Sequence, residues 1–170
     1  MPANPASKVP TPSPGDAAAA QDVAAAIAKH AFLKGFSHKQ LTVIARCGRL
    51  REYLPGDLIF KQGDPAHSFH LIVFGSVLLT HAGEKGNTAI QTLTSGDALG
   101  WSWLFPPFSW HFNATAFEPT RIIELDGERL RELCQSHPEF GYEFMNRIAQ
   151  VVIDRLQHTR RKLFKLTGGH

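Results

Sequence analysis

Apolar residues recur at helical spacing in the first part of the chain. From residue 17 an alanine-rich segment with a helical apolar pattern predicts a helix that ends at Gly35. Ser37 predicts the N-cap of a second helix, because its hydroxyl can accept a hydrogen bond from a backbone N–H of the first turn. The pattern of that helix closes at Cys47 and Gly48.

The middle of the chain changes to short alternating or continuous apolar runs, which are typical of strands. Turn residues separate these runs, with Gly-Asp pairs at 56–57, 63–64 and 96–97. The predicted strands cover residues 49–54, 58–60, 68–74, 76–81, 88–93, 112–116 and 121–125. Short strands with turns at this spacing predict a mainly β fold, either a sandwich or a barrel.

Helical spacing returns at the end of the chain. Asp126 predicts the N-cap of one helix, and Pro138 the start of a longer one that continues to Gly168. The longer helix exceeds what a small β domain can cover, so we expect its far part to meet a partner. Its basic residues surround an apolar stripe, which favours the solvated face of a dimer helix over a protein or anionic-surface contact, with nucleic acid last.

Residues 96–116 differ from everything around them. They hold all three tryptophans of the chain together with three phenylalanines. Large aromatic rings in a loop-rich segment must be buried or must bind something. We therefore expect this segment to carry the function, with the rest of the chain as its scaffold.

Composition and charge exclude several classes. A length of 170 residues and a net charge of +3 indicate one domain with extensions and no strong electrostatic preference for nucleic acid. Cys47 and Cys134 are predicted to be buried, reduced thiols. Residues 1–16 are rich in Pro, Ala and Ser, which indicates a disordered leader and not a signal peptide. No apolar run is long enough to span a membrane, so a cytoplasmic protein is expected.

Three glycine-bearing turns in order carry a family resemblance. The sequence Leu-Pro-Gly-Asp-Leu-Ile-Phe-Lys-Gln-Gly-Asp-Pro-Ala at 54–66 is followed by a strand that ends in Phe-Gly-Ser-Val at 74–77 and by Ser-Gly-Asp-Ala-Leu-Gly at 95–100. With the preceding helices, this arrangement resembles the cyclic-nucleotide-binding domain, as in catabolite-activator-type regulators. The resemblance implies an eight-stranded jelly-roll β-barrel with flanking helices. It also implies a phosphate-binding cassette between the sixth and seventh strands, which falls on residues 100–116 here.

The cassette departs from the family pattern at both of its charged positions. Where the family usually has a Glu that binds the ribose hydroxyl, this chain has Trp101. Where the family has an Arg that pairs with the cyclic phosphate, this chain has Trp110, with His111 beside it. No Arg or Lys lies between Lys85 and Arg121.

The resemblance nevertheless implies a ligand site in the cassette, for cyclic AMP or cyclic GMP. Its candidate residues are Gly100, Trp101, Ser102, Trp103, Leu104, Trp110, His111, Asn113, Ala114 and Thr115. Indoles can stack on a purine, and a helix start near Ser102 can hold an anion. Two alternatives stay open: the indoles fill the pocket themselves, or the site takes a different small ligand.

Catalysis and metal binding find little support. His67 and His70 point to opposite faces of one strand, which disfavours a metal site with His111. Ser102 and Ser109 have no evident base, so no nucleophilic enzyme is expected.

The sequence thus predicts three parts: a leader at 1–16, a cyclic-nucleotide-binding-like barrel with its helices at 17–137, and a C-terminal helix at 138–170. The predicted function is a non-enzymatic regulatory module that senses a ligand and couples its occupancy to the C-terminal helix. The alternative is a protein interaction module with a filled pocket. A homodimer through that helix is expected, and a protein partner is possible. DNA binding is not expected, because no helix-turn-helix follows before His170.

Overall fold

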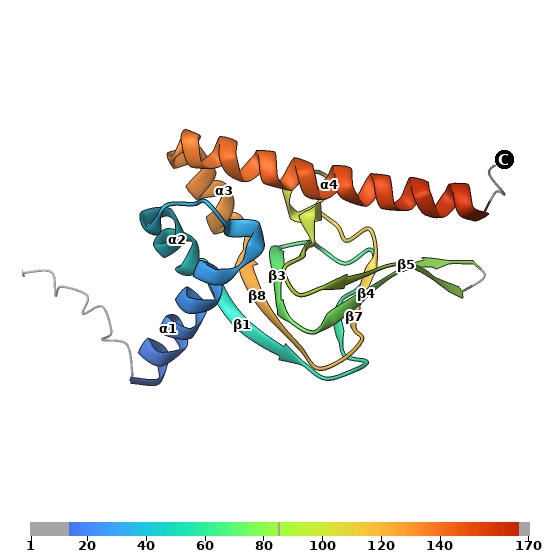
Figure 1. The fold of residues 1–170 in the computed structure, drawn as a ribbon, viewed down its shortest axis with the longest axis horizontal. Helices are drawn as coiled ribbons and strands as arrows, with labels where there is room; N and C mark the ends of the chain where they lie inside the picture. Colours follow the sequence, from blue (N-terminus) through green and yellow to red (C-terminus); the bar gives the residue numbers. More distant parts are fainter. Residues whose placement is uncertain (1–13, 85, 167–170) are drawn as a thin grey trace, which may run out of the picture.

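The N-terminal part of the computed structural model is helical (Figure 1). The structure describes residues 14–84 and 86–166, so the predicted leader lies outside the described residues except for its last part. Helix α1 covers Pro14–Lys29 and thus begins before the predicted start at residue 17. It also ends before Gly35, because a 3-10 turn, η1 (Ala31–Leu33), follows it and His30 Nδ1 accepts a hydrogen bond from the N–H of Phe32.

The N-cap prediction for the second helix is confirmed. Helix α2 covers His38–Ala45, and the Oγ of Ser37 accepts a hydrogen bond from the N–H of Gln40 at 3.3 Å. The Gln40 side chain accepts the N–H of Ser37 in return, at 2.8 Å. This reciprocal pair satisfies two backbone donors that the first turn leaves unpaired.

Within the described residues, eight strands form two facing antiparallel sheets. They are β1 (Gly48–Tyr53), β2 (Leu58–Phe60), β3 (Ser68–Phe74), β4 (Ser76–Gly83), β5 (Gly86–Thr94), β6 (Ala98–Leu99), β7 (Asn113–Ala116) and β8 (Thr120–Asp126). One sheet has the order β1-β8-β3-β6, the other β2-β7-β4-β5. The predicted jelly-roll fold class is confirmed, although the sheets remain separate and do not close into one continuous barrel.

The sequence analysis did not predict strand β6. It forms because Leu99 and Ala98 pair with His70 and Leu71 of β3. Two residues are too few for a period-two pattern, so only the pairing defines the strand.

Strands β3 and β8 of the first sheet are buried on both faces. Phe69, Leu71, Ile123 and Leu125 are fully buried in the cluster shared with the helices, whereas Ile72, Leu99 and Ile122 belong to the cluster shared with the second sheet. Adjacent residues of one strand therefore serve different layers, as the alternation of a strand requires. This division gives the domain two cores, one under the helices and one between the sheets.

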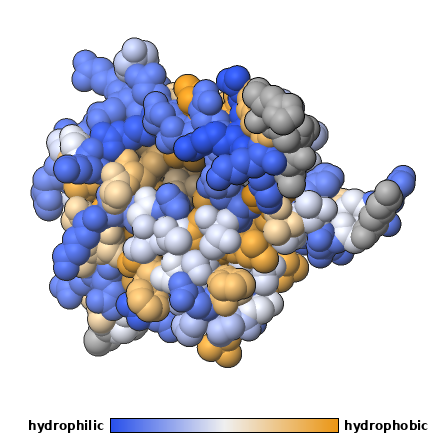
Figure 2. Space-filling model, turned by 45° about the vertical axis from the view of Figure 1, so that its right-hand side comes forward, coloured by the Kyte–Doolittle hydropathy of each residue, from blue (hydrophilic) through white to orange (hydrophobic). Residues whose placement is uncertain are grey.

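The chain ends in helices α3 (Gly127–Ser136) and α4 (Pro138–Leu166). The predicted cap of α3 is confirmed, since the Asp126 carboxylate accepts the N–H of Arg129 at 3.0 Å. Helix α4 runs across the molecule from α3 towards the β4–β5 hairpin (Figure 1), which projects from the body of the domain in the space-filling view (Figure 2). Its far part stays on the domain, because Lys162 Nζ donates to the carbonyl of Ala89 at 2.6 Å. The predicted continuation to Gly168 lies outside the described residues.

Aromatic packing fastens α4 to the rest of the domain. The Phe144 ring makes edge contacts with Phe32 and Phe69, with centroid distances of 5.5 and 5.8 Å. Arg147 adds a hydrogen bond from Nη1 to the carbonyl of Phe32 at 2.6 Å and lies over the Phe36 ring. The first half of α4, the N-terminal helices and β3 therefore share one core.

Substitution of Phe144 by Ala should weaken this core. We expect the free energy of unfolding to fall by about 3–5 kcal/mol, because a fully buried ring leaves a cavity among three elements. Urea denaturation measures the change. Tyr142→Ala is the matched control, since that ring is 74% exposed on the same helix and its loss should cost under about 0.5 kcal/mol. Equal losses in the two variants would contradict the assignment.

Candidate functional site

The segment between β6 and β7 begins with a constrained glycine. Gly100 adopts φ 84°, a left-handed conformation that favours glycine, and the short 3-10 helix η2 (Trp101–Leu104) follows it. A Cβ at Gly100 would also lie 2.9 Å from the Trp110 ring and 3.0 Å from His70 Nδ1. The position therefore needs glycine both for its backbone and for the approach of two rings.

Trp110 lies inside the domain. Its ring is 6% exposed and stacks on Phe60 with a centroid distance of 4.0 Å and an interplanar angle of 15°. Two backbone hydrogen bonds of 2.9 Å hold the residue, from Gly63 N–H to its carbonyl and from its own N–H to the carbonyl of Asp64. The turn before β3 thus fixes the backbone of Trp110, and the indole lies against the rings of Phe60 and His70.

The other two indoles have separate environments. Trp103 is fully buried against the start of α3, where a Cβ on Gly127 would lie 3.0 Å from its ring. Trp101 is half-buried and stacks on His111 with a centroid distance of 5.3 Å. His111 Nδ1 lies 2.9 Å from the Oγ of Ser102, so this pair closes the outer side of the segment.

The predicted site residues therefore divide into groups. Gly100 and Trp110 face the interior, and Ala114 faces it from β7, since it is fully buried in the core between the sheets. Trp101 and His111 lie together on the outer side, and the buried Ser102 contacts His111 from beneath. Trp103 lies under α3 in the core shared with the helices, and Leu104 packs at the edge of that core. Asn113 accepts the N–H of Gln62 at 2.8 Å, and Thr115 follows on the opposite face of β7 from Ala114.

Two arginines from the helices reach the segment, and sequence reasoning missed both. Arg131 of α3 donates from Nη1 to the carbonyl of Trp103 at 2.7 Å and lies over the rings of Trp103 and Phe108. Arg155 of α4 donates from Nη2 to the carbonyl of Ala98 at 3.2 Å. The helices therefore hold the segment at two backbone carbonyls, one before Gly100 and one after it.

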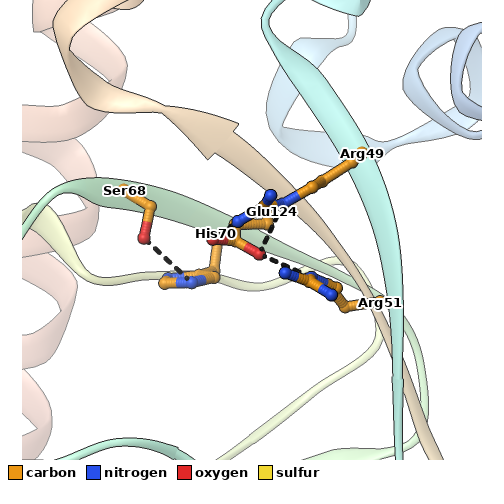
Figure 3. Close-up of polar contacts among 5 residues, drawn as sticks. All are labelled: Arg49, Arg51, Ser68, His70 and Glu124. Carbon is orange, nitrogen blue, oxygen red and sulfur yellow. Dashed lines mark hydrogen bonds and ion pairs between the residues drawn. The ribbon is translucent and has the colours of Figure 1, made fainter.

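Polar side chains of β1, β3 and β8 form a cluster, here called the polar row (Figure 3). Its members are Arg49, Arg51, Ser68, His70 and Glu124. Arg49 and Arg51 of β1 converge on Glu124 of β8, with nitrogen–oxygen distances of 2.8 and 3.0 Å. Burial alone would raise the pKa of Glu124, but the hydrogen bonds from both arginines lower it to about 2.

His70 of β3 pairs with Glu124 in the strand register, and its Nε2 lies 3.3 Å from the Oγ of Ser68. Its side chain is buried and its Nδ1 has no hydrogen-bond partner among the described residues. Burial lowers the pKa of His70 to about 4, so the ring is neutral at pH 7. The polar row thus presents one unpaired ring nitrogen towards Gly100.

Cofactor-type chemistry finds no further support here. His67 is exposed while His70 is buried, and no group of three metal-binding side chains comes together within residues 14–84 and 86–166. Cys47 and Cys134 are free thiols, but both are half-buried and not buried as predicted. None of the helices that the structure describes has the length and apolar character needed to cross a bilayer.

Comparison with known proteins decides the family. The family model described as the cyclic nucleotide-binding domain matches residues 50–137. The chain belongs to the cyclic nucleotide-binding domain family. A solved cyclic nucleotide-binding domain from Methylobacillus flagellatus superposes with a TM-score of 0.74 at 18% identity, covering 89% of this chain and 85% of that one.

Two curated relatives, both longer than this chain, match most of it. Glutaminase 1 of Bradyrhizobium diazoefficiens is 31% identical over 149 residues, which cover 84% of this chain and 22% of that protein. The CRP-like cAMP-activated global transcriptional regulator of Mycobacterium tuberculosis is 21% identical over 141 residues, which cover 82% of this chain and 61% of that protein. The chain thus spans less than two thirds of the length of either relative.

The exposure of the three indoles predicts their quenching. Trp103 and Trp110 are 0% and 6% exposed, so acrylamide should reach mainly Trp101 in this domain. Trp101→Phe should therefore remove most of the quenchable emission, whereas Trp110→Phe should leave it in place. Strong quenching that survives Trp101→Phe would show that a second indole is accessible.

The buried His70 predicts a loss of stability in mild acid. Its pKa is about 4 when folded and 6.5 when unfolded, so the unfolded chain takes up the proton first as the pH falls. The free energy of unfolding should drop by about 2 kcal/mol from this group between pH 7 and pH 5. Burial also lowers the pKa of His30, which adds to the same window.

His70→Gln should reduce that pH 7 to pH 5 difference by about 2 kcal/mol in urea denaturation. The exposed His38 provides the control, since His38→Gln should leave the difference as it is. A His70→Gln protein with the wild-type difference would contradict the assignment of the acid sensitivity to this ring.

Proposed function

We propose that this cyclic nucleotide-binding domain is a non-enzymatic regulatory module that senses a ligand and passes its occupancy to helix α4. The observation that carries the proposal is the double attachment of the cassette to the helices, from Arg155 to the carbonyl of Ala98 and from Arg131 to the carbonyl of Trp103. A ligand that moves the cassette must alter at least one of these bonds. The equilibrium between two helix positions then responds to the ligand, provided that the ligand binds one of them better.

The proposed ligand is a cyclic nucleotide, cyclic AMP or cyclic GMP, bound between the cassette and the two sheets. The name of the Mycobacterium tuberculosis relative, a cAMP-activated regulator, supports this class. For such a ligand to enter, the Trp110 indole has to leave its stack on Phe60. A purine can take its place on the Phe60 ring, because base–aromatic stacking supplies roughly 1–3 kcal/mol.

A second candidate follows from the same indole. Trp110 is 6% exposed and fills the interior, which favours a protein interaction module that has given up a small ligand. The ligand titration described below separates the two candidates.

The proposed partner is a second copy of the chain, through helix α4. Ile153 and Leu156 are 49% and 57% exposed on that helix, and Tyr142 lies on the same side at helical spacing. A contact between copies would cover these side chains. A cytoplasmic setting is part of the proposal, since the two thiols of the domain are free.

A titration of cyclic AMP and cyclic GMP tests the proposal directly. Saturable change of tryptophan emission at about 10–100 µM is expected, because displacement of Trp110 alters its surroundings. Amide exchange in the α4 peptides should slow at saturation. Unchanged emission up to about 1 mM would favour the interaction module. Saturable emission with unchanged exchange in α4 would leave a ligand site without the proposed coupling.

A further inference from the structure

The cassette itself contains no arginine or lysine. Its only ionisable side chain between Gly100 and Ala116 is His111, which stacks on Trp101 and lies against Ser102 on the outer side. An anionic ligand held only by backbone N–H groups would lack a charge-assisted hydrogen bond, which is about twice as strong as a neutral one. Any cation for such a ligand must therefore come from another element.

Arg155 is the cation whose surroundings fit this role. It reaches from α4 to the carbonyl of Ala98, two residues before Gly100. A guanidinium has five N–H donors, and the bond to Ala98 uses one of them. Its Nε is buried and has no hydrogen-bond partner among residues 14–84 and 86–166. The side chain therefore has spare donors at the start of the cassette.

The other candidate cation, Arg131, is already engaged. Its Nη1 bonds the carbonyl of Trp103 at 2.7 Å, and its guanidinium lies 5.9 and 5.5 Å from the ring centroids of Trp103 and Phe108. These contacts hold it over the outer part of η2. Arg155 has no comparable ring contact within the described part of the chain.

Arg155 also lacks a carboxylate partner. In the part of the chain that the structure describes, the arginines paired with a glutamate are Arg49, Arg51, Arg121 and Arg147. Asp97 acts on Arg155 only from a distance, and its carboxylate accepts the N–H of Thr94 at 2.8 Å. Burial lowers the pKa of Arg155. A half-buried cation without a counter-ion is unfavourable, and an anion beside it would offset that cost.

A second buried polar atom without a hydrogen-bond partner lies beside Gly100. His70 Nδ1 would lie 3.0 Å from a Cβ on Gly100, and the ring is 3% exposed. Such atoms are rare in folded proteins, and among the described residues Arg155 Nε, His70 Nδ1 and Trp103 Nε1 are examples near or within the cassette. A polar ligand bound at the start of the cassette would supply partners for Arg155 Nε and His70 Nδ1.

We propose that Arg155 supplies, from helix α4, the positive charge for an anionic ligand of the cassette, in the place of a cation within the cassette itself. The inference rests on the proposed function and requires that the ligand be a monoanion of the phosphodiester type. It also gives a mechanism for the proposed coupling, because the negatively charged ligand would contact both the cassette and Arg155 of α4.

Paired titrations with cyclic AMP and with uncharged adenosine, followed by tryptophan emission, test the role of Arg155. The wild-type domain should prefer cyclic AMP by about ten- to hundredfold, the contribution of one charge-assisted hydrogen bond. Arg155→Gln should reduce this ratio to about one, and Arg155→Lys should keep an intermediate ratio because it keeps the charge. Arg160→Gln, an exposed position on the same helix, is the matched control and should keep the wild-type ratio.

The outcomes separate the two proposals. If neither cyclic nucleotide binds the wild type up to about 1 mM, the proposed function fails and the role of Arg155 fails with it. If cyclic AMP binds and Arg155→Gln weakens cyclic AMP and adenosine equally, Arg155 is structural and the inference is overturned while the proposed function stands. A changed preference for cyclic GMP over cyclic AMP, with the adenosine ratio intact, would overturn it too. If Arg155→Gln loses its cooperative thermal transition, Arg155→Met replaces it, since Met keeps an unbranched stem.

Discussion

The stack of Trp110 on Phe60 is the contact on which the site depends. It places an indole against Phe60 of one sheet and His70 of the other. Gly100 has to be a glycine, because a Cβ there would lie 2.9 Å from this indole and 3.0 Å from His70 Nδ1. The backbone bonds of Trp110 to the turn at residues 63–64 fix the ring before any ligand arrives. The interior is therefore either a filled core or a cavity that opens when the Trp110 side chain moves. The two cases differ in the free energy needed to displace the Trp110 ring.

Because the cassette is bonded to α3 and α4, a displacement of Trp110 would also affect contacts outside the two sheets. Arg131 and Arg155 bond carbonyl groups and do not pair with carboxylates, so their positions follow the backbone of the cassette and not another side chain. Helix α4 is in turn fastened at its first half by Phe144 and Arg147 and farther along by Lys162 on β5. Under the proposed coupling, a shift of the cassette would act on a helix with fixed points on both sides of Arg155, which favours a change of packing over a free swing.

Local sequence signals predicted the helix caps and the turns of the domain well. The caps at Ser37 and Asp126 and the glycine turns depend on residues that are neighbours in sequence, so the pattern alone indicated them. The site was harder, because the direction of Trp110 into the interior and of His111 to the outside depends on pairing with the turn at 63–65. Arg155 looked like one more base on a solvated helix face, and only the packing of α4 over β6 brings it to the carbonyl of Ala98.

The most direct test of the account is whether the two arginines hold the cassette. Fluorine NMR of protein labelled with 5-fluorotryptophan reports the three indoles separately, since their environments differ. The account predicts that Arg131→Gln moves the Trp103 resonance and Arg155→Gln moves the Trp110 resonance, while Arg160→Gln leaves all three in place. Resonances in Arg131→Gln and Arg155→Gln that coincide with those of the wild type would show that the helices and the cassette are independent.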